Sequence, residues 1–134
     1  ISGSNLNFQD IKIDYIGDKA LSAGENSNIS GKNINISNAE IGITSKDLSH
    51  VHISNINLYD GNIGYCAFQK KPEFGPGAIL IEDSKINNIQ IPYLIEENSK
   101  VQINGNSILT KNKKIKNLLY GVKYGKSSGG YYKN

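Results

Sequence analysis

Aliphatic and polar residues alternate with a period of two in many short segments along the chain. The clearest segments are residues 5–8, 10–13, 33–36, 50–53, 55–58 and 78–81. Successive side chains of a β-strand point to opposite faces, so this alternation predicts strands with one buried face and not helices. The abundance of asparagine and isoleucine favours the same β-rich fold.

A five-residue pattern also recurs, in which an acidic residue, any residue, serine, any residue and a branched aliphatic residue follow one another. Its copies start at Glu25, Asp47 and Glu97. The first two copies are 22 residues apart, and the last two are 50 apart, which equals two periods plus a six-residue insertion around residues 70–77. A fixed period that contains several strands predicts an all-β solenoid, a right-handed parallel β-helix.

The repeat predicts about five coils of ~22 residues around a shared aliphatic interior. The coils are expected over residues 1–118, followed by an irregular C-terminal tail over 119–134. Residues 69–77 contain two prolines and two glycines, so they are expected to leave the coil wall as a loop. One extra residue is expected in the first coil, at Gly17 or Asp18.

Within these coils the alternation assigns specific positions. We expect Ile41, Ile43 and Ile63 to point into the interior, and the fifth coil to begin at Val101. Asparagines at corresponding turns are expected to stack as a structural ladder, Asn33 on Asn55 with Asp10 one coil earlier. His50 and His52 alternate with aliphatic residues, which predicts that both point outward into solvent.

The chain enters its first coil at once, without a polar or helical cap. A solenoid end normally needs such a cap, so we expect either a fragment of a longer β-helix or self-association through this end. The sequence contains no apolar run of membrane-spanning length and no signal-peptide pattern, so no membrane insertion is expected.

Charge and cysteine content narrow the function classes. The net charge is +3, and many lysines lie in the run from 111 to 116 and not along a stripe, which argues against a nucleic-acid partner. The single cysteine, Cys66, has no cysteine-enzyme signature around it and is interpreted as a small packed side chain.

The coil period over about residues 4–118 resembles the pectate-lyase-like right-handed parallel β-helix superfamily. Residues 17–25, 45–49 and 70–75 also resemble β-helix segments of bacterial surface proteins associated with spore-coat-H-type kinase-like domains. The resemblance implies polysaccharide lyases, hydrolases or epimerases, and also adhesins or phage tail proteins. The polygalacturonase and alginate-epimerase signatures are missing and the chain has no arginine, so no catalytic residue is assigned and catalysis stays open.

Stacking the coils in the 22-residue register places polar residues in two columns. One holds Asp18, Glu40, Asn62 and Gln90, and the other holds Glu25, Asp47, Gln69 and Glu97. Carboxylates stacked one strand apart repel each other unless a cation intervenes. A salt-bridged turn ladder, a calcium ion at Glu25 and Asp47, and a catalytic acid and base are the three interpretations; no other cofactor is expected.

Between these columns the third strand of each coil presents small residues outward. Two rows are expected there, Ala20, Gly42, Gly64 and Pro92 in one and Ser22, Thr44, Cys66 and Leu94 in the other. They form either a flat floor for an extended sugar chain or a row that only tolerates the local twist.

The loop at 69–77 is expected to bring an aromatic ring and two lysines over this floor. An aromatic ring stacks on sugar rings and lysines attract uronate carboxylates. The hypothesis is a carbohydrate-binding site formed by Asp18, Glu25, Lys46, Asp47, Lys70, Lys71 and Phe74. The expected function is a β-helix module of a secreted or cell-surface bacterial protein that contacts an anionic polysaccharide. A purely structural stalk or tail segment and a fragment of a lyase or epimerase are the alternatives.

Overall fold

The computed structural model describes residues 1–109 and 115–120, and within this part the chain is almost entirely β. The elements are β1 (Asn5–Ala23), β2 (Asn28–Lys46), β3 (His50–Phe68), β4 (Ala78–Ile95), β5 (Lys100–Ile103), β6 (Asn106–Ser107) and the short helix α1 (Ile115–Tyr120). The six strands form one sheet in chain order, parallel from β1 to β5 and antiparallel between β5 and β6. Among the described helices, none is long and apolar enough to cross a membrane.

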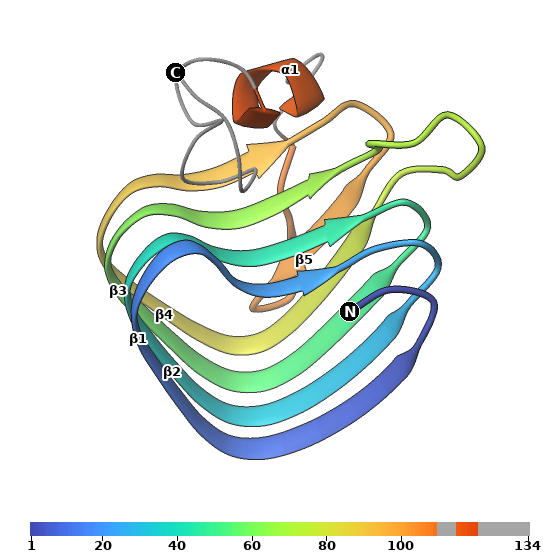
Figure 1. The fold of residues 1–134 in the computed structure, drawn as a ribbon. Coiled ribbons are helices and arrows are strands. Elements are labelled where there is room, and N and C mark those ends of the chain that lie inside the picture. The colour runs from blue at the N-terminus through green and yellow to red at the C-terminus, as the bar shows by residue number, and fades with distance from the viewer. Residues whose placement is uncertain (110–114, 121–134) are drawn as a thin grey trace.

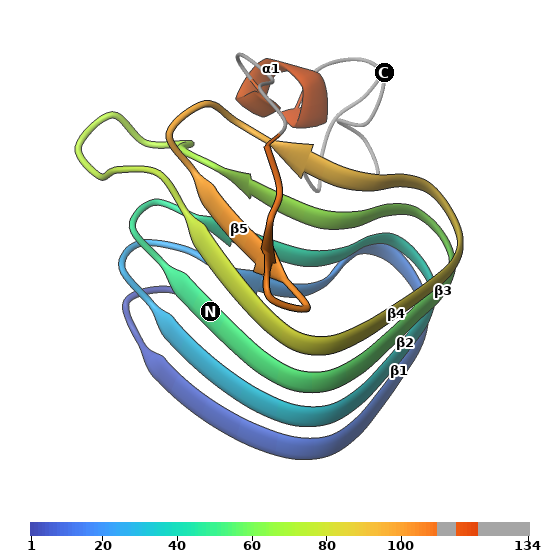
Figure 2. The same ribbon diagram turned by 180° about the vertical axis from the view of Figure 1, so that it is seen from behind.

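The four long strands lie on top of one another and curve around a common interior (Figures 1 and 2). Each strand bends sharply at residues with a left-handed backbone, such as Asn33 (φ 60°) and Asn38 (φ 55°) in β2. Asparagine and aspartate adopt this conformation more readily than other residues with a side chain. The regularly spaced asparagines and aspartates therefore mark the corners of each strand layer.

The strand register confirms the period read from the sequence. Leu6 pairs with Ile29, 23 residues later, and the offset falls to 22 after a register shift between Ile16 and Lys19, where the extra residue was expected. The pairing of β2 with β3 keeps an offset of 22, and that of β3 with β4 has an offset of 28. The six additional residues lie in the predicted loop at 69–77, which joins β3 to β4.

The recurring acid and serine pattern forms the turn that leads from one layer to the next. Glu25 and Asp47 have left-handed backbones, with φ of 54° and 55°. Ser27 is fully buried, and its hydroxyl donates to the Gly24 carbonyl oxygen at 2.7 Å while its backbone N–H donates to the Ser49 hydroxyl at 3.0 Å. The serines therefore satisfy buried backbone groups between layers, and this role in the turn accounts for the recurrence of the pattern.

The predicted asparagine ladder is confirmed. The Asn55 amide donates to the Asn33 side-chain oxygen, and the Asn33 amide donates to the Asp10 carboxylate, both at 2.9 Å. These three residues occupy equivalent left-handed corners of consecutive layers. Their side chains join the layers through hydrogen bonds.

The interior is filled by aliphatic columns that run through all the layers. In β2 and β3 the core residues are 0–5% exposed, and Ile29, Ile43, Ile53 and Tyr65 are 0–2% exposed. Burying a side chain of this size stabilises the fold by about 1.5–3 kcal/mol. No single layer could enclose these residues, so the stack is stabilised by contacts between its layers.

Two interior positions were predicted wrongly. Ile41 and Ile63 do not join the interior but pack with Cys66, Phe68 and residues of α1 in a second apolar cluster. Ile41 and Ile43 belong to different clusters although they are two residues apart, so the alternation of faces is interrupted between them. A period-of-two count along the sequence does not detect such a change of face.

The last layer differs from a fifth coil. Val101 and Ile103 pair in parallel with β4 as expected, but the chain then reverses at Asn104 and Gly105 and returns as β6. Both turn residues have positive φ, which permits this tight reversal. The helix α1 was not expected from the sequence, and the predicted boundary between 118 and 119 falls inside it. The remainder of the predicted tail, 121–134, lies outside the described residues.

Candidate functional site

The loop at 69–77 folds back against the turns that connect the earlier layers. The Gln69 side-chain amide donates to the carbonyl oxygens of Lys71 and Phe74 at 3.1 and 2.8 Å, which closes the loop on itself. The Leu48 backbone N–H donates to the Gly75 carbonyl oxygen at 3.0 Å. These bonds hold the loop beside the turn at Asp47, so its two lysines lie close to the column of acids.

We use the name lysine corner for the polar residues gathered at this place. They are Ser22, Glu25, Lys46, Asp47, Lys70 and Lys71. Five of the seven residues of the hypothetical carbohydrate site are thus brought together.

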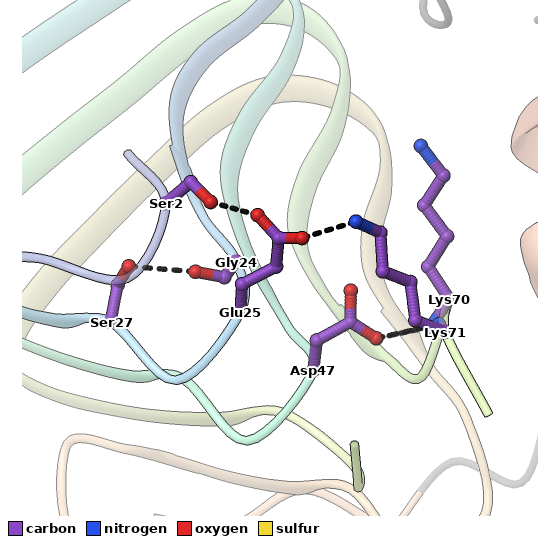
Figure 3. Close-up of polar contacts among 7 residues, drawn as sticks. All are labelled: Ser2, Gly24, Glu25, Ser27, Asp47, Lys70 and Lys71. Atoms are coloured by element: carbon purple, nitrogen blue, oxygen red, sulfur yellow. Dashed lines mark hydrogen bonds and ion pairs between the residues drawn. The ribbon is translucent and has the colours of Figure 1, made fainter. Parts of the chain in front are cut away.

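Asp47 positions the loop. Its side chain is fully buried, and its Oδ1 accepts hydrogen bonds from the backbone N–H groups of Lys70 and Lys71, both at 2.8 Å (Figure 3). Its other oxygen, Oδ2, is buried without a hydrogen-bond partner in the described part of the chain. A carboxylate that accepts two backbone N–H bonds fixes the start of the loop and so determines where both lysine side chains begin.

Glu25 lies between two donors. Its carboxylate accepts from the Ser2 hydroxyl and from the Lys71 ammonium (Figure 3). The bond from Lys71 is the main cause that lowers the pKa of Glu25, and the same bond raises the pKa of Lys71. Both side chains are partly exposed, at 33% for Glu25 and 41% for Lys71, so solvent screens this pair.

Lys46 is a partly buried lysine of the lysine corner. Its Nζ donates to the Ser22 hydroxyl at 3.1 Å. Burial lowers the pKa of Lys46 most, and the positive charges of Lys19 and Lys70 lower it further, against weaker opposing effects of Asp47 and Glu25. The lysine charges thus oppose protonation of Lys46 more strongly than the two carboxylates favour it.

The other two residues of the hypothetical site have different roles. The Asp18 carboxylate pairs with the neighbouring Lys19 ammonium at 3.2 Å. Phe74 is half-buried, and its carbonyl oxygen is one of the acceptors that close the loop. In Figure 3 the Lys70 side chain extends away from the Glu25 and Asp47 carboxylates.

Of the two interpretations of these small-residue rows, the flat floor for a sugar chain is wrong. Thr44 and Cys66 are fully buried and Leu94 is 4% exposed. Cys66 and Leu94 pack in the second apolar cluster with Ile115 and Leu119 of α1, which occupies the outer side of these layers (Figure 1). Of this row only Ser22, in β1, keeps partial exposure.

The glycines of the neighbouring row are required by close packing of the layers. A Cβ atom on Gly42 would lie 2.8 Å from the Gly64 carbonyl oxygen, and one on Gly64 would lie 2.6 Å from the Pro92 carbonyl oxygen. Both distances are shorter than real contacts, and the obstacle is backbone that cannot move aside. These glycines therefore allow the layers to approach and do not form a binding surface.

Sequence reasoning missed Glu96. Its carboxylate accepts from the Gln69 backbone N–H at 3.0 Å and from the Ile115 backbone N–H at 3.1 Å, so it connects the loop to the start of α1. The residue one layer earlier in this column is Phe68, and the one before that is Lys46. The column has no repeated chemistry, so no periodic signal could have identified Glu96.

The two histidines are exposed, as expected. His52 is bonded through Nε2 to the Glu82 carboxylate at 2.5 Å, and its side chain is 49% exposed. A hollow of about 590 Å³ lies beside His50 and His52 and reaches Leu80 and Leu109. It lies along the first part of the layers, and none of its lining residues belongs to the lysine corner.

The calcium interpretation has little geometric support at Glu25 and Asp47. The Glu25 carboxylate is bonded to a hydroxyl and an ammonium, whereas Asp47 accepts from backbone N–H groups. Within residues 1–109 and 115–120, no three histidine, cysteine or acidic side chains are grouped as a metal site would need.

Comparisons with known proteins add no further identification. Neither the protein-family models, nor the curated proteins, nor the solved structures contain a match to this chain. The assignment of a function therefore rests on the residues of the lysine corner themselves.

Proposed function

We propose that the chain is a right-handed parallel β-helix module of a secreted or cell-surface bacterial protein, and that its lysine corner binds an anionic polysaccharide. The observation that carries the proposal is the gathering of Lys46, Lys70 and Lys71 at one corner, where burial lowers the pKa of Lys46 and the charges of Lys19 and Lys70 lower it further. Lysines in such proximity repel one another, and an anion bound among them relieves this repulsion. A uronate carboxylate is an anion of the appropriate size and charge.

The neighbouring groups supply the rest of a sugar site. Ser22 is partly exposed and offers a hydroxyl, and Glu25 and Lys71 offer a carboxylate and an ammonium that are screened by solvent but accessible. Sugar hydroxyls need both donors and acceptors, which this set contains. Because α1 covers the outer side of the later layers, the ligand lies at the corner and along the loop and does not cross the floor.

Isothermal titration calorimetry with an oligogalacturonate tests the proposal. The double variant Lys46→Gln, Lys70→Gln is expected to bind at least about tenfold more weakly than the wild type, since each lost charge contact costs on the order of 1 kcal/mol. The matched control is Lys85→Gln, an exposed lysine of β4 that lies 3.9 Å from Asp83. A neutral oligosaccharide is the ligand control and is expected not to bind.

The pH dependence has a definite sign. Lys46 must be protonated to attract an anion, and its pKa is lowered in the folded chain. Affinity is therefore expected to decline as the pH rises through this lowered pKa, earlier than for an ordinary lysine. Equal binding by the wild type and the double variant, or binding by neither, would rule out the lysine corner as a polysaccharide site.

Two alternatives have a specific observation in their favour. The complete burial of Thr44 and Cys66 favours a purely structural module, which would bind no glycan. The lowered pKa of Lys46 favours a lyase or epimerase fragment, since a lysine that deprotonates more easily can act as a general base. Ultraviolet absorbance of an unsaturated uronate in the same titration samples would identify elimination.

A further inference from the structure

The hollow of about 590 Å³ beside the two histidines shares no lining residue with the lysine corner. It lies on the outward face of the first part of the layers, where β3, β4 and β5 run side by side and the chain returns through β6. Sites for small molecules commonly have volumes of ~300–1,000 Å³. The hollow is therefore large enough to hold a small-molecule ligand.

One small side chain in a row of longer ones creates this hollow. The residues at equivalent positions of successive layers in this row are Asn5, Asn28, His50, Ala78 and Lys100. Neighbouring strands are about 4.8 Å apart, so the backbones of His50 and Lys100 are separated by roughly 10 Å, with only the Ala78 methyl group between their side chains. The gap above Ala78 admits a flat group that stands upright between the two longer side chains.

Apolar side chains border the same gap. Leu80 follows Ala78 on the outward face of β4 and is 37% exposed, although its neighbours Ile79 and Ile81 are buried. The Ile108 backbone N–H donates to the Val101 carbonyl oxygen at 2.9 Å, which brings Leu109 to the opposite rim of the hollow. A ligand gains most from these leucines if it has an apolar body that covers them.

The charged groups of the hollow are all basic. His50, His52 and Lys100 line it, and its lining contains no aspartate or glutamate. His52 is bonded through Nε2 to the Glu82 carboxylate at 2.5 Å, and Glu82 does not line the hollow. Within residues 1–109 and 115–120, neither the His50 imidazole nor the Lys100 ammonium has a side-chain hydrogen bond or an ion pair. Two donors are thus available to a ligand, and their charge favours an anion.

We propose that the hollow binds a small aromatic carboxylate. The ring lies over Ala78 and packs against Leu80 and Leu109, because a flat ring fits the gap and buries apolar area at little entropic cost. The carboxylate accepts hydrogen bonds from the Lys100 ammonium and the His50 imidazole, and its single negative charge matches the one ammonium in the lining. The inference goes beyond the lysine corner and would hold if no polysaccharide bound there.

Backbone amide NMR titration of the full chain with 3-phenylpropionate tests the proposal. Saturable shifts are expected at residues 78–80 and 100–102. The amide 3-phenylpropanamide keeps the ring without the charge, and propionate keeps the charge without the ring. Each is expected to bind at least about tenfold more weakly, since each lacks one of the two contacts. No saturable binding of 3-phenylpropionate, shifts elsewhere in the chain, or equal affinity for either analogue overturns the proposal.

Two variants test the residues of the hollow, with folding monitored by circular dichroism. Ala78→Leu fills the gap and is expected to abolish binding, whereas Ser30→Leu, at an exposed position of β2 outside the hollow, is expected to leave it unchanged. Lys100→Gln is expected to weaken binding about tenfold, and Lys85→Gln is its matched control. Lys100 is exposed, so this variant tests the site even where Ala78→Leu does not fold. Wild-type affinity in Lys100→Gln, or equal loss in a variant and its control, overturns the proposal.

Discussion

The two ends of the strand stack differ in how far their outermost layer is covered. At one end β1 leaves its apolar side chains partly exposed and has charged residues along its edge. At the other end the hairpin of β5 and β6 and the helix α1 cover the last layers, where Ile115 and Leu119 are fully buried. Both views of the fold show the helix lying against only one end of the stack (Figures 1 and 2).

The comparison shows that a repeated sequence stabilises the middle of a stack but not its ends. A middle layer has a neighbouring layer on each side, so its apolar side chains are covered from both sides. A terminal layer lacks one neighbour and needs elements outside the repeat, such as α1 and the Glu96 carboxylate that accepts from the backbone N–H of Ile115. Among the described residues, most apolar side chains of β1 are only partly buried.

The largest expected difference in stability is between a substitution in the middle of the stack and one at the β1 end. Ile43 is fully buried and pairs with Leu21 of β1, which is half-buried. Ile43→Asp is expected to prevent folding, since an unpaired carboxylate in the interior costs several kcal/mol or more. Leu21→Asp is expected to cost much less, because the carboxylate can reach water.

Circular dichroism and thermal melts of these two variants measure the difference. If Ile43→Asp keeps the β-sheet spectrum of the wild type, the assignment of Ile43 to the interior fails. If both variants are destabilised equally, the side chain of Leu21 in β1 is buried to the same extent as that of Ile43 in the middle of the stack.

A smaller effect is expected from weakening the cap at the other end. Leu119→Ala removes a fully buried side chain that packs in the cluster with Cys66, and it is expected to cost about 2–3 kcal/mol. Leu118→Ala is the control, since Leu118 is 37% exposed.

The thiol of Cys66 reports on the cap directly. Burial raises the pKa of this thiol and makes it unreactive. Thiol labelling is expected to be slow in the wild type and in Leu118→Ala but faster in Leu119→Ala. Unchanged labelling of Leu119→Ala would show that α1 does not protect the later layers.

The smallest effect concerns acid stability at the β1 end. Hydrogen bonds from Ser37 and Asn38 lower the pKa of Asp14 below its ordinary value of 3.8. A carboxyl group with a lowered folded pKa contributes stability above its unfolded pKa, and this contribution is lost as the pH falls through the folded pKa. Asp14→Asn is therefore expected to flatten the dependence of the melting temperature on pH below 3.8. Parallel curves for the wild type and the variant would contradict this contribution.

Much of the fold could be predicted because the chain repeats itself. The offset of 22, the extra residue before Lys19 and the loop at 69–77 all follow from aligning the chain with itself. The proximity of Lys71 to Glu25 was also predictable, because the loop leaves the stack beside the column of acids. The floor was predicted wrongly because its cover, α1, lies outside the repeat.

The sequence by itself determined the strands, the period, the corners and the position of the lysine corner, because each depends on local alternation or on equivalent positions of successive repeats. Only the tertiary structure decided that Ile41 and Ile63 face a second cluster, that Gly42 and Gly64 are needed for close approach, and that Glu96 connects the loop to α1. These features arise where segments without a repeat relation meet. Contacts of that kind depend on the path of the chain in space, and no period along the sequence records them.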